Sequence, residues 1–229
     1  VIEAVGVEAV RLASAQTVDI SSAGSVDVAA GGADFAVGCT YKYINAGPGA
    51  PAFIYVSPEH ADHVDPALAG WLGHDAPFAF EQGYRPGEGI ERMRVGTPPV
   101  LQMAALDAAL DVWDKVDMRK LRRRSLELTG LMIEEVETHC PGLRLATPRE
   151  NEARGSQVSF RSEHGYAIMQ ALIDLGVIGD FRAPDILRFG ITPLYIGEDE
   201  IHEAVEVLAR ILRGALWDHP RYHRRKAVT

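Results

Sequence analysis

The sequence predicts an α/β protein with two lobes, and three observations support this. Short apolar runs alternate with Gly- and Pro-rich loops over the first hundred residues, helical periodicity follows Leu101, and strand and helix patterns alternate beyond Pro141–Gly142. We therefore expect one domain over residues 1–100, a connecting long helix or helix pair over 101–138, and a small α+β domain over 139–229.

Composition narrows the class of protein. The 229 residues are 47% apolar with a net charge of −9, which fits a globular chain and disfavours a nucleic-acid binder, because phosphate affinity comes mainly from clustered Lys and Arg. We expect no membrane segment, since no run of about 18 apolar residues occurs. Only Cys39 and Cys140 are present and no leader pattern is seen, so we expect a reducing, cytoplasmic location.

The most informative segment of the first domain surrounds a lysine. Two strand-like runs, Phe35–Val37 and Ala52–Val56, enclose a loop in which Lys42 stands between Tyr41 and Tyr43. Partial burial there would lower the lysine pKa and leave the free amine that carbonyl chemistry needs. Alternatively, the lysine extends past its aromatic neighbours to water. The spacing alone leaves both interpretations open.

An upstream carboxylate adds to this pattern. The run Thr17–Ile20 resembles a short strand that contains Asp19, and a loop of small residues follows it. A strand-end aspartate and a loop lysine suit pyridoxal phosphate (PLP), because the lysine amine bonds to the aldehyde and the aspartate keeps the ring nitrogen protonated. Asp19 is otherwise an ordinary turn residue.

The helical stretch 101–138 shows apolar residues at three- and four-residue steps. Basic residues lie on its other face, and we expect them to form a solvated helix face and not an RNA-binding patch. These residues are Arg119, Lys120, Arg122, Arg123 and Arg124.

The last domain alternates strands and helices. We expect strands at 143–147, 158–161 and 187–191, and helices at 165–175, ended by Gly176, and at 199–216. The second helix has acidic residues at its start and basic residues at its end, which matches the helix dipole. The basic tail from Arg221 onwards is expected to be a frayed, solvated end.

Five blocks of the sequence form a specific set: CTYKYINAGPG at 39–49, LAGWLGH at 68–74, RVGTPP at 94–99, RGSQVSF at 154–160 and LRFGITPLY at 187–195. Together these blocks resemble the kynureninase family, fold-type-I PLP-dependent enzymes similar to class V aminotransferases. The chain resembles the C-terminal portion of that family: part of the large PLP-binding domain plus the small α+β domain.

The resemblance implies an activity and a set of site residues. It implies hydrolysis of L-kynurenine to anthranilate and L-alanine in the tryptophan catabolism that leads to NAD precursors, and it leaves 3-hydroxykynurenine open as a second substrate. It implies a homodimer whose sites are shared across the interface. It makes Lys42 the catalytic residue and Arg188 the group that binds the substrate α-carboxylate. The implied PLP-binding residues are Asp19, Tyr41, Lys42, Trp71 and Thr97.

Each of these residues also has a purely structural interpretation. Trp71 could anchor a core, Thr97 could be a turn residue before two prolines, and Arg188 could pair with Asp185 or another acid. A metal site at His60–His63 would lack a third ligand, so we predict no metal.

Two departures from the family keep other functions open. The loop after Asp19 reads ISSAG, with Ser21 or Ser22 where the family has a histidine, and family chains are nearly twice as long. The alternatives are another class V enzyme, such as a desulfurase or an aminotransferase, and a non-catalytic scaffold that keeps the PLP fold.

Overall fold

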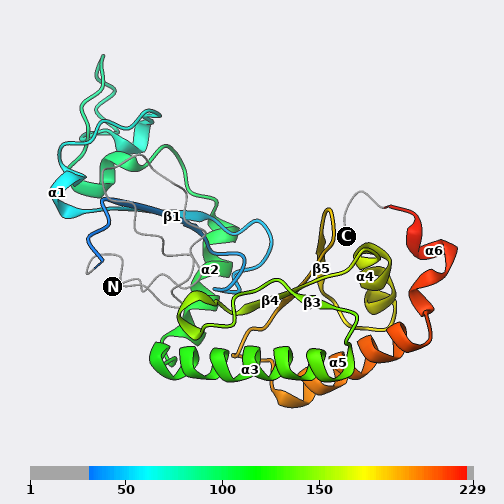
Figure 1. Cartoon of the computed structure of the whole chain (residues 1–229). Coiled ribbons are helices and arrows are strands. Elements are labelled where there is room, and N and C mark those ends of the chain that lie inside the picture. Colours follow the sequence, from blue (N-terminus) through cyan, green and yellow to red (C-terminus); the bar gives the residue numbers. More distant parts are fainter. Residues whose placement is uncertain (1–30, 226–229) are drawn as a thin grey trace. The chain divides into compact units, whose positions relative to one another are not determined.

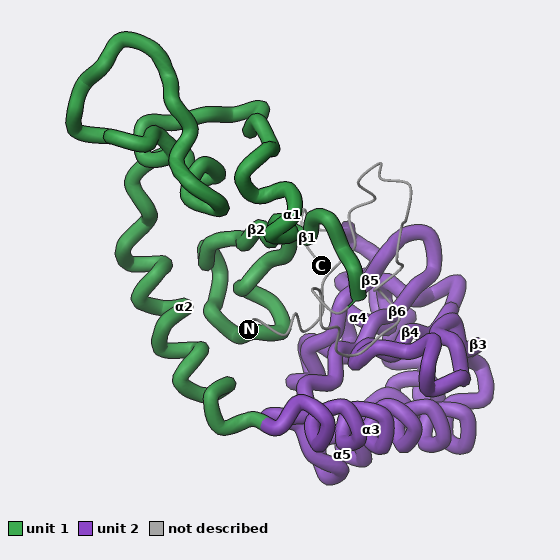
Figure 2. The backbone as a smooth tube through the Cα atoms, turned by 90° about the vertical axis from the view of Figure 1, so that its left-hand side faces the viewer, with its two compact units in different colours: residues 1–21, 25–116 green, residues 22–24, 117–229 purple. Residues whose placement is uncertain are grey.

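The computed structural model describes residues 31–225. These residues form two compact units, which divide between Val116 and Asp117 (Figure 2). The expected strand at Thr17–Ile20, with Asp19 and the serines after it, lies outside the described residues. Within 31–225, no helix combines the length and the apolar character that crossing a bilayer requires.

The first unit contains the lysine hairpin. Strands β1 (Phe35–Cys39) and β2 (Ala52–Val56) pair antiparallel, with Phe35 opposite Val56 and Cys39 opposite Ala52. This confirms the two strand-like runs and extends the first by two residues. Its helical segments are α1 (Pro58–Ala61), the 3₁₀ turns η1 (Trp71–Gly73) and η2 (Gly89–Met93), and α2 (Val100–Trp113).

The stretch 101–138 forms two helices. Helix α2 ends at Trp113, and α3 (Met118–His139) begins after Asp117, whose carboxylate accepts hydrogen bonds from the backbone N–H groups of Arg119 and Lys120. This N-cap satisfies two donors that the first helical turn leaves without a partner. These bonds, the one to Lys120 above all, lower the pKa of Asp117.

The second unit adds further helices and strands to α3. Among them are β3 (Arg144–Leu145), β4 (Gln157–Arg161), α4 (Gly165–Asp174), β5 (Asp180–Arg182), β6 (Ile186–Gly190) and α5 (Glu198–Arg213), together with the 3₁₀ turns η3 (Asn151–Ala153) and η4 (Leu216–Asp218). The strands form a four-stranded antiparallel sheet in the order β3-β4-β6-β5, accompanied by helices α3, α4 and α5 (Figure 1). The expected helices and strands of this region are confirmed, while the strand β5 was not expected.

The core of the second unit lies between one face of this sheet and the helices. Leu128 of α3, Phe160 of β4, Leu172 of α4, Leu187 of β6 and Leu208 of α5 are all fully buried. Burying a Leu or Phe side chain contributes roughly 1.5–3 kcal/mol. The sheet and its helices therefore form a rigid support for the side chains on the opposite face of the sheet.

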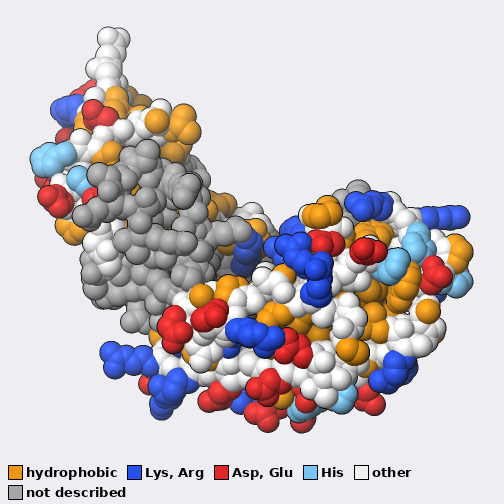
Figure 3. Space-filling model, viewed as in Figure 1, with side chains coloured by type: hydrophobic (Ala, Val, Ile, Leu, Met, Phe, Trp, Pro, Cys, Tyr) orange, Lys and Arg blue, Asp and Glu red, His pale blue; other side chains and the backbone are white. Residues whose placement is uncertain are grey.

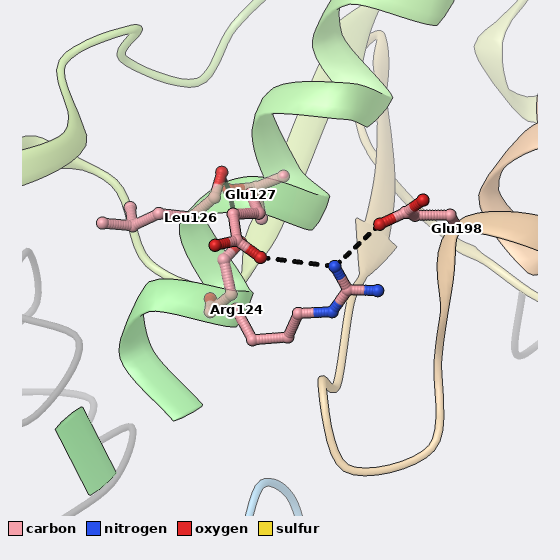
Figure 4. Close-up of polar contacts among 6 residues, drawn as sticks. Arg124, Leu126, Glu127 and Glu198 are labelled. Atoms are coloured by element: carbon pink, nitrogen blue, oxygen red, sulfur yellow. Dashed lines mark hydrogen bonds and ion pairs between the residues drawn. The ribbon is translucent and has the colours of Figure 1, made fainter. Parts of the chain in front are cut away.

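The basic run at the start of α3 is only partly a solvated face. Arg119, Lys120 and Arg123 are exposed. Arg124, in contrast, donates to Glu127 of its own helix and to Glu198 at the start of α5, the latter at 2.8 Å (Figure 4). The hydrogen bond to Glu198, first of all, raises the pKa of Arg124. Figure 3 shows acidic and basic side chains intermixed over the second unit.

The C-terminal tail is better ordered than the sequence predicts. Residues Pro220–His223 form the short helix α6, and Tyr222 is buried. The Tyr222 hydroxyl donates to Asp174 at the end of α4 at 3.1 Å. The expectation of a frayed end from Arg221 onwards was wrong for this segment, because an aromatic ring among the arginines packs against the core.

Candidate active site

The loop that carries Lys42 is held in shape by its own backbone. The Thr40 hydroxyl donates to the Pro51 carbonyl at 2.5 Å, and the Ala46 N–H donates to the Thr40 carbonyl at 3.1 Å. Asn45 adopts a positive φ of 64°, which Asn tolerates better than most residues. The turn residues and the Gly-Pro-Gly run therefore produce a defined loop between β1 and β2.

A tryptophan distant in sequence anchors this loop. The indole N–H of Trp113, the last residue of α2, donates to the Ile44 carbonyl at 3.0 Å. Its ring also lies 5.8 Å from the ring of Tyr43. Ile44 is buried, so the residues just after Lys42 are fixed to the first unit. Trp113 lies within the stretch 101–138, whose apolar spacing does not reveal this role.

Lys42 itself is exposed. Its Nζ atom lies 5.4 Å from the centroid of the Tyr41 ring, a distance typical of a cation–π contact. Tyr41 is also exposed. Of the two interpretations that the spacing leaves open, the described chain matches the lysine that extends to water, because the loop directs Tyr41 and Lys42 outward while Ile44 and Ala46 point inward.

A second segment places Trp71 against the backbone before Thr97. A Cβ atom on Gly70 would lie 1.7 Å from the Val95 carbonyl oxygen, and one on Gly73 would lie 2.6 Å from the Arg94 carbonyl oxygen. Only glycine allows two backbone segments to approach this closely. The glycines on both sides of Trp71 therefore bring residues 70–73 into direct contact with residues 94–95.

Hydrogen bonds fix this approach. The Tyr84 hydroxyl donates to the Gly73 carbonyl at 2.9 Å, and the Gly87 N–H donates to the same oxygen at 2.8 Å. Arg92, which is buried, donates to the Val64 carbonyl at 3.3 Å. Hydrogen bonds from the residues after η1 therefore hold this turn, and Arg92 connects the same region to Val64, which precedes the turn.

Trp71 and Thr97 come from the two sides of this contact. A Cβ atom on Gly96 would lie 3.7 Å from the Trp71 indole nitrogen, and Thr97 is the next residue and is exposed. Trp71 is 47% exposed and lines a cavity of about 460 Å³ together with His74, Phe80 and Tyr84. The structure thus brings the Trp71 segment and the Thr97 segment together in the first unit.

Arg188 lies in the second unit, on β6. Its guanidinium donates to Asp180 of β5, the residue directly opposite in the antiparallel pair. The sequence suggested Asp185 or another acid as the partner. Asp185 instead binds Arg161, at 2.8 Å. Asp180 is therefore the other acid, which the sequence did not single out because β5 was not expected.

His60 of the first unit has a structural role. His60 contacts the Asp34 carboxylate at 2.9 Å and stacks on Phe35 with 5.7 Å between ring centroids. Among residues 31–225, no three His, Cys, Asp or Glu side chains are grouped so as to hold a metal ion.

Comparison with solved structures identifies the fold. A cystine C–S lyase in complex with cysteine persulfide matches with a TM-score of 0.69 at 19% identity, covering 83% of this chain and 50% of that one. An alanine–glyoxylate aminotransferase from Nostoc sp. matches with a TM-score of 0.61 at 19% identity, over 82% of this chain and 50% of that one. The fold is that of the fold-type-I PLP-dependent enzymes, as the sequence predicts.

Sequence comparison identifies the relatives. The chain is 50% identical over 200 residues to a curated kynureninase of Pseudomonas fluorescens, covering 86% of this chain and 48% of the relative. It is 49% identical over 199 residues to a kynureninase of Burkholderia mallei, with the same coverage. The chain thus spans about half the length of the curated relatives it matches. The family model of the kynureninase C-terminal domain matches residues 121–208. Residues 121–208 are therefore similar to the kynureninase C-terminal domain, and the chain is similar to kynureninases along most of its length.

Proposed function

We propose that this chain forms part of a kynureninase, which hydrolyses L-kynurenine to anthranilate and L-alanine with PLP as cofactor, and that 3-hydroxykynurenine is the second candidate substrate. The observation that carries the proposal is 50% identity to a curated kynureninase over 86% of the chain. A match of that extent takes in the middle of the chain, where Lys42, Trp71, Thr97 and Arg188 lie. The activity belongs to tryptophan catabolism and NAD precursor formation.

The residues of the first unit suit PLP in their chemistry. Tyr41, Trp71 and Thr97 are exposed neutral donors of the kind that bind a phosphate, and Lys42 offers an exposed amine for the aldehyde. We assign the contact with the ring nitrogen to Asp19, which lies outside the described residues. When bound, PLP supplies a ring that accepts electrons from the substrate carbon atoms.

The residues of the chain have separate roles in this proposal. Lys42 moves a proton at the substrate α-carbon through its Nζ atom, which requires the neutral amine. Because Lys42 is exposed within residues 31–225, the cofactor or a second subunit has to cover it. Arg188 binds the substrate α-carboxylate with its planar guanidinium, which holds the substrate in one orientation.

A homodimer with shared sites is part of the proposal. Phe78 and Phe80, near Trp71, are 73% and 87% exposed, and exposed aromatic clusters are typical of surfaces that bind another chain. We assign Trp71 and Thr97 to the phosphate of the neighbouring site. We also propose residues 1–100 as part of the PLP-binding domain, 101–138 as its connection and 139–229 as the small domain.

A cytoplasmic location is proposed from the cysteines. Cys39 and Cys140 are both free thiols, and Cys140 is buried. Burial raises the pKa of the Cys140 thiol to about 11, so it stays protonated at neutral pH. Two unpaired thiols suit a reducing compartment.

The test joins this chain to the N-terminal part of the Pseudomonas fluorescens kynureninase, which supplies the length that the chain does not span. We expect fluorescent anthranilate from L-kynurenine, a near-visible absorbance band with PLP, and loss of both in Lys42→Ala. A folded protein with the band but without anthranilate would contradict kynurenine hydrolysis and favour another class V activity. A folded protein without the band at saturating PLP would favour the alternative of a non-catalytic scaffold that keeps the PLP fold.

A measurement on the chain itself complements this test. Borohydride reduction fixes PLP on the amine that binds it, and peptide mass spectrometry identifies the residue. We expect the label on Lys42. Labelling of other lysines in proportion to their exposure would contradict the role of Lys42.

A further inference from the structure

The outer face of the small sheet carries a polar row. In β6, Leu187 and Phe189 are buried in the core, so Arg188 between them points to the opposite face. The register places Ser159 of β4 on one side of Arg188 and Asp180 of β5 on the other. Phe181 is buried in the core, which puts Asp180 on the same outer face as Arg188.

Two arginines share the Asp180 carboxylate. Arg188 Nη2 donates to Asp180 Oδ2, and Arg182 Nη2 lies 3.2 Å from the same oxygen. The Arg188 and Asp180 side chains are only 27% and 35% exposed, so water screens this pair less than it screens a fully exposed one. The Arg188 Nε atom is buried and lacks a hydrogen-bond partner among the described residues.

This arrangement restricts the guanidinium of Arg188. An arginine side chain loses considerable rotamer entropy when it binds a carboxylate, and a partner that already holds it reduces that loss. Asp180 is on a paired strand, and its backbone is fixed by the register with β6. A second cation, Arg182, also attracts the Asp180 carboxylate.

We propose that Asp180 is a positioning residue for substrate binding, which holds the Arg188 guanidinium ready for the α-carboxylate. The inference rests on the proposed function and assigns a further residue to it. Asp180 does not touch the reacting atoms, so it acts on binding and not on the chemical step. The alternative is that Asp180 competes with the substrate carboxylate for Arg188, which predicts the opposite change in KM.

The test uses Asp180→Asn in the joined protein described above, with Asp185→Asn as the matched control. Each variant removes, from an ion pair with an arginine, one carboxylate that lies on the β5–β6 hairpin. We expect Asp180→Asn to raise KM for L-kynurenine about tenfold, equivalent to about 1.4 kcal/mol, with kcat within about twofold. Asp185→Asn should leave both constants unchanged. An unchanged or lowered KM in Asp180→Asn, or an equal rise in both variants, would overturn the inference.

A binding measurement separates this inference from the proposed function. In the ¹⁵N-labelled chain, titration with L-alanine should shift the Arg188 Nε–H resonance, and Asp180→Asn should weaken that binding about tenfold. Absence of anthranilate from the unsubstituted protein would count against the function alone. L-Alanine that binds both forms equally would count against the role of Asp180.

Discussion

The contact between the Trp71 segment and the Thr97 segment depends on the absence of a side chain at Gly70. Gly70 has φ −144° and ψ 168°, an extended conformation that alanine adopts without strain. Gly70→Ala therefore tests only the space around the new Cβ atom. That atom would lie 1.7 Å from the Val95 carbonyl oxygen, whereas carbon–oxygen contacts normally measure about 3.3–3.6 Å.

The two segments must therefore separate by more than about 1.5 Å. Overpacking of this kind costs about 1–3 kcal/mol, and a displacement of about 1 Å at a binding site costs up to about 100-fold in function. We expect Gly70→Ala to lower the free energy of unfolding by about 1–3 kcal/mol and to weaken PLP binding at least tenfold. Denaturant unfolding and PLP titration by near-visible absorbance measure the two effects.

Gly96→Ala is the matched control. Its Cβ atom would lie 3.7 Å from the Trp71 indole nitrogen, an ordinary contact, so stability and PLP affinity should stay close to those of the parent. If Gly70→Ala behaves like Gly96→Ala, the close approach of the Gly70 and Val95 backbones is not what positions Trp71.

Three further predictions concern the rest of the fold. Trp113→Phe removes the donor to the Ile44 carbonyl and should cost about 1–2 kcal/mol in chemical unfolding, with increased hydrogen exchange confined to the lysine loop; a uniform increase would argue against anchoring. Leu128→Ala empties a fully buried position and should cost about 2–5 kcal/mol, whereas a loss below 1 kcal/mol would refute the core assignment. Asp117 has a lowered pKa, so the stability that its carboxylate contributes is present above pH 3.8 and is lost as the pH falls through the pKa of the folded state. The melting temperature of the parent should therefore exceed that of Asp117→Ala at neutral pH, and this difference should shrink at acidic pH. A difference that stays constant with pH would contradict the N-cap.

Local patterns predicted most of the secondary structure, and the reason is physical. Helix α5 and strand β6 follow the periodicity of side chains that face one core, and this periodicity can be read within a dozen residues. Strand β5 is only three residues long, and such a strand carries too few alternating positions to be recognised. The ordered tail at Tyr222 was missed for a similar reason, because one aromatic residue makes no pattern.

The sequence by itself predicted the α/β class and the hairpin that carries Lys42, because backbone propensity, apolar spacing and turn chemistry are local properties, whereas the candidate site residues came from the resemblance to the kynureninase family. Only the tertiary structure decided that Trp113 anchors the lysine loop, that Gly70 admits the Val95 carbonyl, and that Asp180 holds Arg188. It also decided that Lys42 is exposed in the described chain. These contacts join different elements of the fold, and their energy depends on distances that no local pattern specifies.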